Sequence, residues 1–275
     1  RVGSPRPLFS RGFAWLFVLT RVMGRNDLLP STADFLTLDA RMTEHIKTEI
    51  SDDGIARLTL SQPARRNALN AEMWAALPLI LSALELEKPT VLIVQGDGDH
   101  FAAGADISEF ETLYSTAESA AQISADIQTA FDALAAFPMP TIASIRGACV
   151  GGGCGLALCC DIRLADATAR FAITPAKLGL VYPFADIARL IDAVGVANAK
   201  DILFSARIVK AKPAQKMGLI HGRFGVDALE AAVMDYALGL TRLSPESLRV
   251  TKSMITAYQN GQRGETETTR AQFLD

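Results

Sequence analysis

The chain has 275 residues, enough for one large domain or two small ones with a substantial core. Hydrophobic residues make up 49% of it and charged residues 21%, which is typical of a folded globular protein and excludes a disordered chain. The formal net charge of -3 gives no general basic surface, so we expect no nucleic-acid partner.

The first 41 residues differ in composition from the rest. They carry five arginines and no acidic residue before Asp27, around the apolar run GFAWLFVLT (12–20). That run is too short to span a bilayer, and no other long apolar stretch suggests a membrane segment. Arg-rich, acid-poor segments also occur in signal and transit peptides. We expect residues 1–41 to be an upstream extension outside the fold, with a targeting segment as the alternative.

From Met42 onward the chain alternates between strand and helix patterns. Asn70 is a plausible N-cap for the helical pattern that follows it. Beyond residue 186 nearly every pattern is helical. This order predicts an α/β core over residues 42–205 and a helical region over residues 206–275. The predicted strands are 55–60, 90–96, 141–145 and 161–166, and a further helical stretch covers roughly 107–136.

The cysteines predict buried, reduced side chains and no metal site. All four lie within one apolar segment, and the three histidines are far from them in the sequence. A zinc site would need spaced cysteine pairs together with histidines. Reduced thiols suit a reducing compartment, so we expect a cytoplasmic protein. The cysteines are Cys149, Cys154, Cys159 and Cys160.

Small residues follow two of the predicted strands, as FAAGADI (101–107) and VGGGCG (150–155). Each stretch leaves backbone N–H groups unshielded by bulky side chains, and the second one opens a helix. Two such donors aimed at one point make an oxyanion hole. Glycines also permit tight turns and close helix packing, which is the structural alternative. Periodicity does not tell whether the two stretches meet in space.

Four motifs in order resemble the crotonase superfamily, the enoyl-CoA hydratase/isomerase family. The resemblance covers about residues 45–274 and implies a spiral of ββα units followed by a helical oligomerisation region over residues 206–275. It also implies a homotrimer or homohexamer. Rossmann and P-loop signatures are absent from the sequence. The motifs are RRNALN (65–70), HFAAGADI (100–107), GACVGGGCGLALCCDIRLA (147–165) and FAITPAKLGL (171–180).

The resemblance implies an acyl-CoA substrate whose thioester carbonyl lies between the backbone N–H groups of Ala105 and Gly152. These donors would stabilise an enolate on the acyl group. Arg65 or Arg66 would meet the phosphates of coenzyme A, and no cofactor is implied beyond the coenzyme A of the substrate itself. The implied substrate-binding residues are Arg66, Ala68, Ala103, Asp106, Ile107, Gly151, Pro175 and Ala176.

The chain departs from the family at both catalytic glutamates, where it has Gly155 and Ala176. Neither residue transfers a proton, so we do not expect standard hydration by the usual pair of glutamates. Asp186 beside an apolar wall is our candidate base, and Tyr182 is our candidate proton or hydrogen-bond donor. The alternatives are that Asp186 caps the following helix and that Tyr182 only packs. We expect an acyl-CoA lyase or isomerase with non-standard acid/base residues; a silent acyl-CoA-binding protein and a structural subunit are the alternatives.

Overall fold

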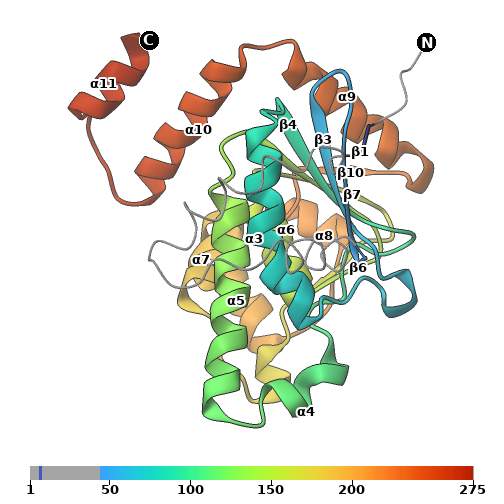
Figure 1. Cartoon of the computed structure of the whole chain (residues 1–275). Helices are drawn as coiled ribbons and strands as arrows, with labels where there is room; N and C mark the ends of the chain where they lie inside the picture. The colour runs from blue at the N-terminus through green and yellow to red at the C-terminus, as the bar shows by residue number, and fades with distance from the viewer. Residues whose placement is uncertain (1–5, 8–43, 275) are drawn as a thin grey trace, which may run out of the picture.

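The structure is a computed structural model that describes residues 6–7 and 44–274. Strands and helices alternate through the blue-to-yellow part of the chain, and helices dominate the red end (Figure 1). The strands are β1 (Arg6–Pro7), β2 (Ile46–Ile50), β3 (Ile55–Leu60), β4 (Val91–Gly96), β5 (Thr141–Ile145), β6 (Ala148–Val150), β7 (Ile162–Asp166), β8 (Arg170–Ala172), β9 (Val209–Lys210) and β10 (Gly222–Phe224).

Long and short helices connect these strands. The α-helices are α3 (Ala71–Leu86), α4 (Phe110–Leu113), α5 (Ala117–Ala135), α6 (Gly152–Cys159), α7 (Phe184–Ser205), α8 (Ala211–Lys216), α9 (Leu229–Thr241), α10 (Pro245–Gln259) and α11 (Glu267–Leu274). The 3-10 turns are η2 (Pro63–Arg65), η3 (Ile107–Glu109), η4 (Pro175–Leu178) and η5 (Val226–Ala228).

Seven strands form the main sheet, in the order β1-β2-β3-β4-β5-β7-β10. From β3 to β10 neighbouring strands are parallel, whereas β2 is antiparallel to both β1 and β3. A second sheet has the order β6-β8-β9. Because β4 and β5 are adjacent and parallel, the segments that follow them leave the sheet at the same edge. Those two segments contain the small-residue stretches that the sequence singles out.

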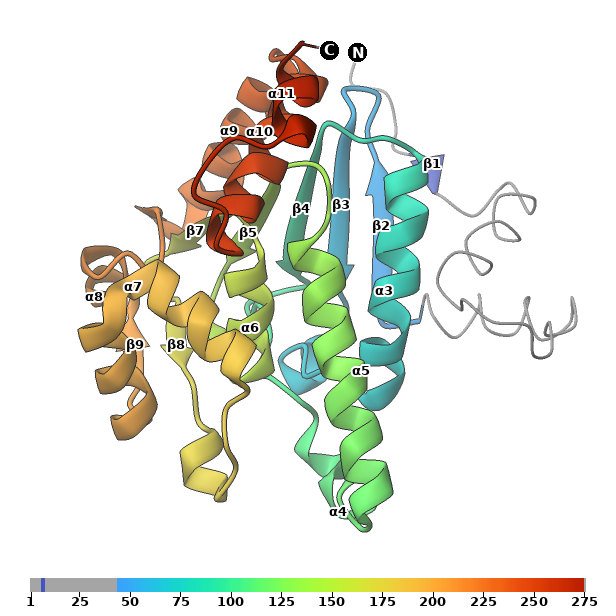
Figure 2. The same cartoon turned by 90° about the vertical axis from the view of Figure 1, so that its left-hand side faces the viewer.

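Helices cover both faces of the main sheet. Figures 1 and 2 show α3 and α5 side by side along one face, where the larger apolar core lies. On the opposite face, α9 buries Leu229, Val233 and Ala237 against strand residues that include Ile93 and Ile142. Helix α3 begins where the sequence predicts, because the Oδ1 of its N-cap residue Asn70 accepts the N–H of Met73 at 2.9 Å.

The predicted α/β class is confirmed, and the strands at 55–60 and 141–145 have the predicted bounds. The expected helix over 107–136 is wrong as one element, because a break before Thr116 separates α4 from α5. Thr116 caps α5 by accepting the N–H of Ser119 at 3.1 Å. The nearly all-helical reading beyond residue 186 misses β9 and β10. Strands of two or three residues are too short to show alternation.

The expectation for residues 1–41 lies almost entirely outside the described residues. Within that range only Arg6–Pro7 is described, as β1, which pairs with Ile50 and Glu49 of β2. In the C-terminal part, α9 contributes to the apolar layer under the sheet, so residues 229–241 belong to the folded core.

Candidate functional site

The two small-residue stretches lie directly against each other. The N–H of Ala102 donates to the carbonyl of Ala148 at 2.9 Å, and the N–H of Val150 donates to the carbonyl of Ala102 at 3.0 Å. This pairing brings the following residues together: a Cβ added to Gly152 would lie 3.7 Å from the amide nitrogen of Ala105. The two candidate oxyanion-hole residues are therefore neighbours in space.

The backbone N–H groups at this junction differ in whether the described residues supply an acceptor for them. One neighbour of each candidate donor is used: the N–H of Asp106 donates to the carbonyl of Leu69 at 2.8 Å, and the N–H of Gly151 donates to the carbonyl of Ala172 at 2.8 Å. Within residues 44–274, the N–H groups of Ala105 and Gly152 donate to no protein acceptor. Gly152 is the first residue of α6, where helical N–H groups have no partner inside the helix. Both donors are thus free for an external oxygen.

A cavity of about 510 Å³ opens beside these amides. Its volume is in the usual range for a small-molecule site. The cavity brings together eight of the residues singled out from the sequence, which are Ala103, Ala105, Ile107, Gly151, Gly152, Pro175, Tyr182 and Asp186. Aromatic side chains supply much of the remaining wall, namely Trp74, Phe110, Tyr114 and Phe131.

The other expected substrate-binding residues do not line this cavity. Ala68 is buried, and Ala176 is exposed on η4. Arg66 lines a separate cavity of about 470 Å³ together with Arg146 and Arg170. Of the expected substrate contacts, Arg66 therefore lies at a second hollow, and Ala68, Asp106 and Ala176 line neither.

Asp106 has a structural environment beside the oxyanion-hole candidates. Its carboxylate pairs with the guanidinium of Arg65 and accepts the N–H of Ser108 at 3.0 Å. Burial favours the neutral acid, but the hydrogen bonds from Ser108 and Arg65 outweigh it and lower the pKa of Asp106. Arg65 also donates to the hydroxyl of Ser108 at 2.9 Å. This cluster fixes the loop that carries Ala105.

Asp186 is a buried carboxylate with one satisfied and one free oxygen. Its side chain is 2% exposed, and its Oδ1 accepts from Nη1 of Arg189 at 2.8 Å. Arg189 in turn pairs with Asp132 at 2.5 Å. Oδ2 of Asp186 has no partner in the described chain. Burial raises the pKa of Asp186, and the charge of Arg189 opposes that rise. The N-cap of α7 is Pro183, so Asp186 does not cap this helix.

Tyr182 and Trp74 have buried polar atoms without partners as well. Burial raises the pKa of the Tyr182 phenol well above its ordinary value, so this group is a neutral donor at neutral pH. Among the described residues, the buried side-chain atoms that lack a hydrogen bond are Trp74 Nε1, Tyr182 Oη and Asp186 Oδ2. All three residues line the same cavity. An unsatisfied buried group costs about 1–3 kcal/mol, so this concentration marks a functional wall.

Aromatic packing occupies the position where the resemblance places the first glutamate. A Cβ added to Gly155 would lie 2.4 Å from Cζ of Phe131. Phe131 also meets Trp74 edge to face, with 5.5 Å between ring centroids. The apolar pattern of α3 predicts Trp74 only as core, and nothing local in the sequence links Phe131 to Gly155. Sequence reasoning missed both side chains for that reason.

Two other titratable side chains near the small-residue stretches have structural partners. His100 accepts the N–H of Ala148 through Nδ1 at 3.1 Å and does not line the 510 Å³ cavity. Glu109 accepts the N–H of Ala71 at 2.8 Å, at the start of α3. The four cysteines are free and buried, as predicted. Burial raises the pKa of the Cys160 thiol to about 12, which makes it a poor nucleophile.

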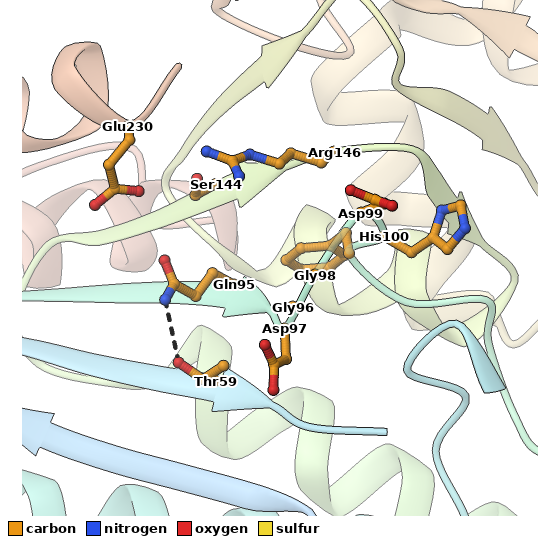
Figure 3. Close-up of a pocket in the computed structure, with 11 residues that line it drawn as sticks. Thr59, Gln95, Gly96, Asp97, Gly98, Asp99, His100, Ser144, Arg146 and Glu230 are labelled. Carbon is orange, nitrogen blue, oxygen red and sulfur yellow. Dashed lines mark hydrogen bonds between the residues drawn. The ribbon is translucent and has the colours of Figure 1, made fainter. Parts of the chain in front are cut away.

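A third pocket, of about 270 Å³, is polar and lies at the end of β4 (Figure 3). In that view Arg146 extends toward Glu230, while Gln95 donates to the hydroxyl of Thr59 at 3.2 Å. Asp97 in this pocket accepts from Ser61 and Lys47. The unpaired buried atoms of Trp74, Tyr182 and Asp186 lie on residues of the 510 Å³ cavity instead, so we place the candidate active site there.

Two further properties of residues 44–274 bear on the class of protein. No three side chains among the described histidines, cysteines, aspartates and glutamates are arranged to hold a metal ion. None of the described helices combines the length and apolar character needed to cross a bilayer.

Comparison with known proteins identifies the relatives of this chain. The sequence model of the enoyl-CoA hydratase/isomerase family matches residues 51–274. A peroxisomal Delta(3,5)-Delta(2,4)-dienoyl-CoA isomerase of Arabidopsis thaliana is 30% identical over 232 residues, which are 80% of this chain and 84% of the relative.

Solved structures agree with this match. A member of the enoyl-CoA hydratase/isomerase family from Hyphomonas neptunium is 42% identical, with a TM-score of 0.82, over 85% of this chain and 90% of the other. An enoyl-CoA hydratase/carnitine racemase from Magnetospirillum magneticum is 34% identical, with a TM-score of 0.80, over 85% of this chain and 88% of the other.

Proposed function

Because the chain belongs to the enoyl-CoA hydratase/isomerase family, we propose that it is an acyl-CoA isomerase that works through a thioester enolate. The observation that carries this proposal is the pair of free N–H groups of Ala105 and Gly152 beside a cavity whose wall holds the unpaired Oδ2 of Asp186 and Oη of Tyr182. The thioester carbonyl oxygen would accept both N–H groups. Removing one donor from such a hole typically costs about 2.7–4 kcal/mol of transition-state stabilisation.

The proton steps fall to Asp186 and Tyr182 in the wall of the same cavity. Oδ2 of Asp186 would take the proton from the α-carbon, and the electron pair of that C–H bond would move to the carbonyl oxygen as the enolate forms. Return of the proton to another carbon of the conjugated acyl group completes an isomerisation with no other reactant. The raised pKa of Asp186 brings this carboxylate closer to the basicity that such a step requires. Tyr182 would donate a hydrogen bond or a proton.

Isomerisation is favoured over hydration by the packing at Gly155. Hydration needs a water molecule held by polar groups next to the acyl chain, and a held water typically has two to four polar partners. The ring of Phe131 occupies the space next to Gly155 that a carboxylate side chain would fill. Proton transfer within the acyl group requires only one acid/base group. Asp186 can fill that role alone.

The test is turnover by the purified protein on a panel of saturated, 2-enoyl, 3-enoyl, 3-hydroxyacyl and malonyl-type CoA thioesters, followed by mass spectrometry and NMR. We expect interconversion of 3-enoyl and 2-enoyl thioesters, lost in Asp186→Asn and kept in the matched surface variant Asp235→Asn. Asp235 is exposed on α9. Hydration as the sole reaction, or full activity in Asp186→Asn, contradicts the proposal.

The second candidate is an acyl-CoA-binding protein without catalysis. Gly155 and Ala176, at the positions where the resemblance places glutamates, favour it. It predicts micromolar or tighter binding of acyl-CoA by calorimetry with no product from any member of the panel. Assembly into a homotrimer or homohexamer is part of the proposal and is measured by analytical ultracentrifugation.

A further inference from the structure

The mouth of the 510 Å³ cavity carries large apolar side chains that face solvent. One lip is the segment 107–114, where Ile107 is 70% exposed. The other lip is the segment 178–184, where Val181 is 90% exposed and Phe184 is 85% exposed. In Figures 1 and 2 α4 and the yellow turn at 175–178 project from the same end of the molecule, so the two lips share that end.

These lips are continuous with the cavity. Ile107 and Tyr114 on one side, and Leu178, Leu180 and Val181 on the other, all line it while remaining 37% to 90% exposed. Scattered exposed apolar residues are ordinary on a protein surface, but a contiguous group at the rim of a site marks a binding surface. A bound group that covers these side chains would therefore extend outward from the cavity.

The unpaired polar atoms of the cavity lie in its buried part, on Trp74, Tyr182 and Asp186. Most of its exposed wall is hydrocarbon, namely Ile107, Leu178, Leu180, Val181 and Pro183, and the exposed polar members are Tyr114, Ser124 and Lys177. Resting on the proposed function, we propose that the two lips hold the outer part of a hydrocarbon chain, so that the site selects medium- and long-chain acyl thioesters over short ones. The same free amides at Ala105 and Gly152 would bind the thioester of every chain length.

The proposal predicts how affinity changes with chain length. Each methylene that leaves water for an apolar surface tightens binding by about fourfold. We therefore expect the Kd for saturated acyl-CoA to fall steeply from butanoyl to octanoyl, and to fall further to dodecanoyl as the lips are covered. A site that ended at the inner cavity would show no further gain from the outer methylenes.

The experiment is isothermal titration of butanoyl-, octanoyl- and dodecanoyl-CoA, with free coenzyme A alongside, into the full chain. The test variants are Tyr114→Ser and Val181→Ser. Their matched controls are Tyr236→Ser and Val196→Ser, which alter side chains that are 42% and 53% exposed and do not line this cavity. We expect the lip variants to lose about tenfold in affinity for dodecanoyl-CoA with no change for free coenzyme A, and the controls to lose nothing.

Each outcome separates this inference from the proposed function. If no thioester binds, the proposed function fails. If all chain lengths bind alike, the acyl-CoA site stands and the selection of long chains is wrong. Equal loss for free coenzyme A and dodecanoyl-CoA in Val181→Ser assigns the lips to the coenzyme arm and overturns the inference. A change in sedimentation in both lip variants, with flat chain-length dependence, makes a second copy of the chain their cover and overturns it too.

Discussion

Replacing Tyr182 by phenylalanine removes one oxygen atom, and we expect this change to affect stability and activity in opposite directions. The hydroxyl is buried and has no hydrogen-bond partner in the described chain. Its loss relieves a desolvation penalty of about 1–3 kcal/mol. The small void left behind costs about 1 kcal/mol. We therefore expect Tyr182→Phe to raise the free energy of unfolding by about 1 kcal/mol, which corresponds to about 2–4 °C in Tm for a chain of this size.

Activity should change in the opposite direction. A side chain that donates a proton or a hydrogen bond in the reaction typically contributes about 100- to 10,000-fold. We expect kcat/KM for 3-enoyl-CoA isomerisation to fall by about 100-fold or more in Tyr182→Phe. Stability is measured by urea unfolding at one fixed protein concentration, and activity by absorbance of the conjugated thioester. Tyr236→Phe on α9 is the matched control, because Tyr236 is 42% exposed and its variant should change neither quantity.

Two results would refute this reasoning. A drop of about 1 kcal/mol or more in the free energy of unfolding would mean that the hydroxyl has a partner in the folded protein. Unchanged kcat/KM together with raised stability would mean that Tyr182 only packs against the cavity, which leaves Asp186 as the sole acid/base group.

The remaining predictions concern charges around the same site. Arg189→Gln removes the charge that lowers the pKa of Asp186, so the acid limb of the kcat/KM profile should move to higher pH. Asp132→Asn removes a charge that raises this pKa, so the acid limb should move to lower pH or stay where it is. A parallel shift in both variants would contradict this assignment. The lowered pKa of Asp106 gives stability that is present above its ordinary value of 3.8 and is lost as pH falls through the folded pKa. Urea unfolding of Asp106→Asn at neutral pH should show a loss of about 1.5–3 kcal/mol, with less dependence on pH below 4 than in the parent chain; equal pH dependence would place the titration elsewhere.

The sequence predicts the parts of this fold whose signal is local. The runs at 55–60 and 141–145 are apolar and bounded by turn residues, and the Asn70 cap precedes a clear helical pattern, so these elements lie where they are expected. The strands β6, β8 and β9 have two or three residues and owe their conformation to pairing with partners far along the chain. No local pattern marks such strands.

The candidate site likewise has features that the local sequence predicts and features that depend on the fold. The free N–H of Gly152 follows from a glycine run at the start of a helix, which is a local feature. That Ala105 lies beside it depends on the pairing of Ala102 with the segment 148–150, which links residues about fifty positions apart. The apolar pattern around Trp74 predicts a core position and gives no indication of its unpaired N–H. The sequence therefore predicts which backbone N–H groups and which acid/base side chains are candidates for the site. Only the fold shows which of them line the same cavity.

Gly155 illustrates why the glutamate that the resemblance places at this position is not accommodated by one substitution. A Cβ at this position would lie 2.4 Å from Phe131, so Gly155→Glu forces the ring to move. We expect it to lower the free energy of unfolding by about 1–3 kcal/mol. Gly239→Glu is the matched control, because a Cβ there meets nothing within 4 Å, and it should be neutral or stabilising.

The double variant Gly155→Glu with Phe131→Ala tests whether the two positions act as one unit. Removing the ring makes room for the carboxylate, so the two changes should be non-additive by about 0.5–3 kcal/mol, with the double variant more stable than the sum of the single ones. Any gain of hydratase activity should appear only in that double variant. If Gly155→Glu alone hydrates enoyl-CoA and has the same free energy of unfolding as the parent chain, the ring of Phe131 moves aside without a measurable cost. In that event the packing at this position would not favour isomerisation over hydration.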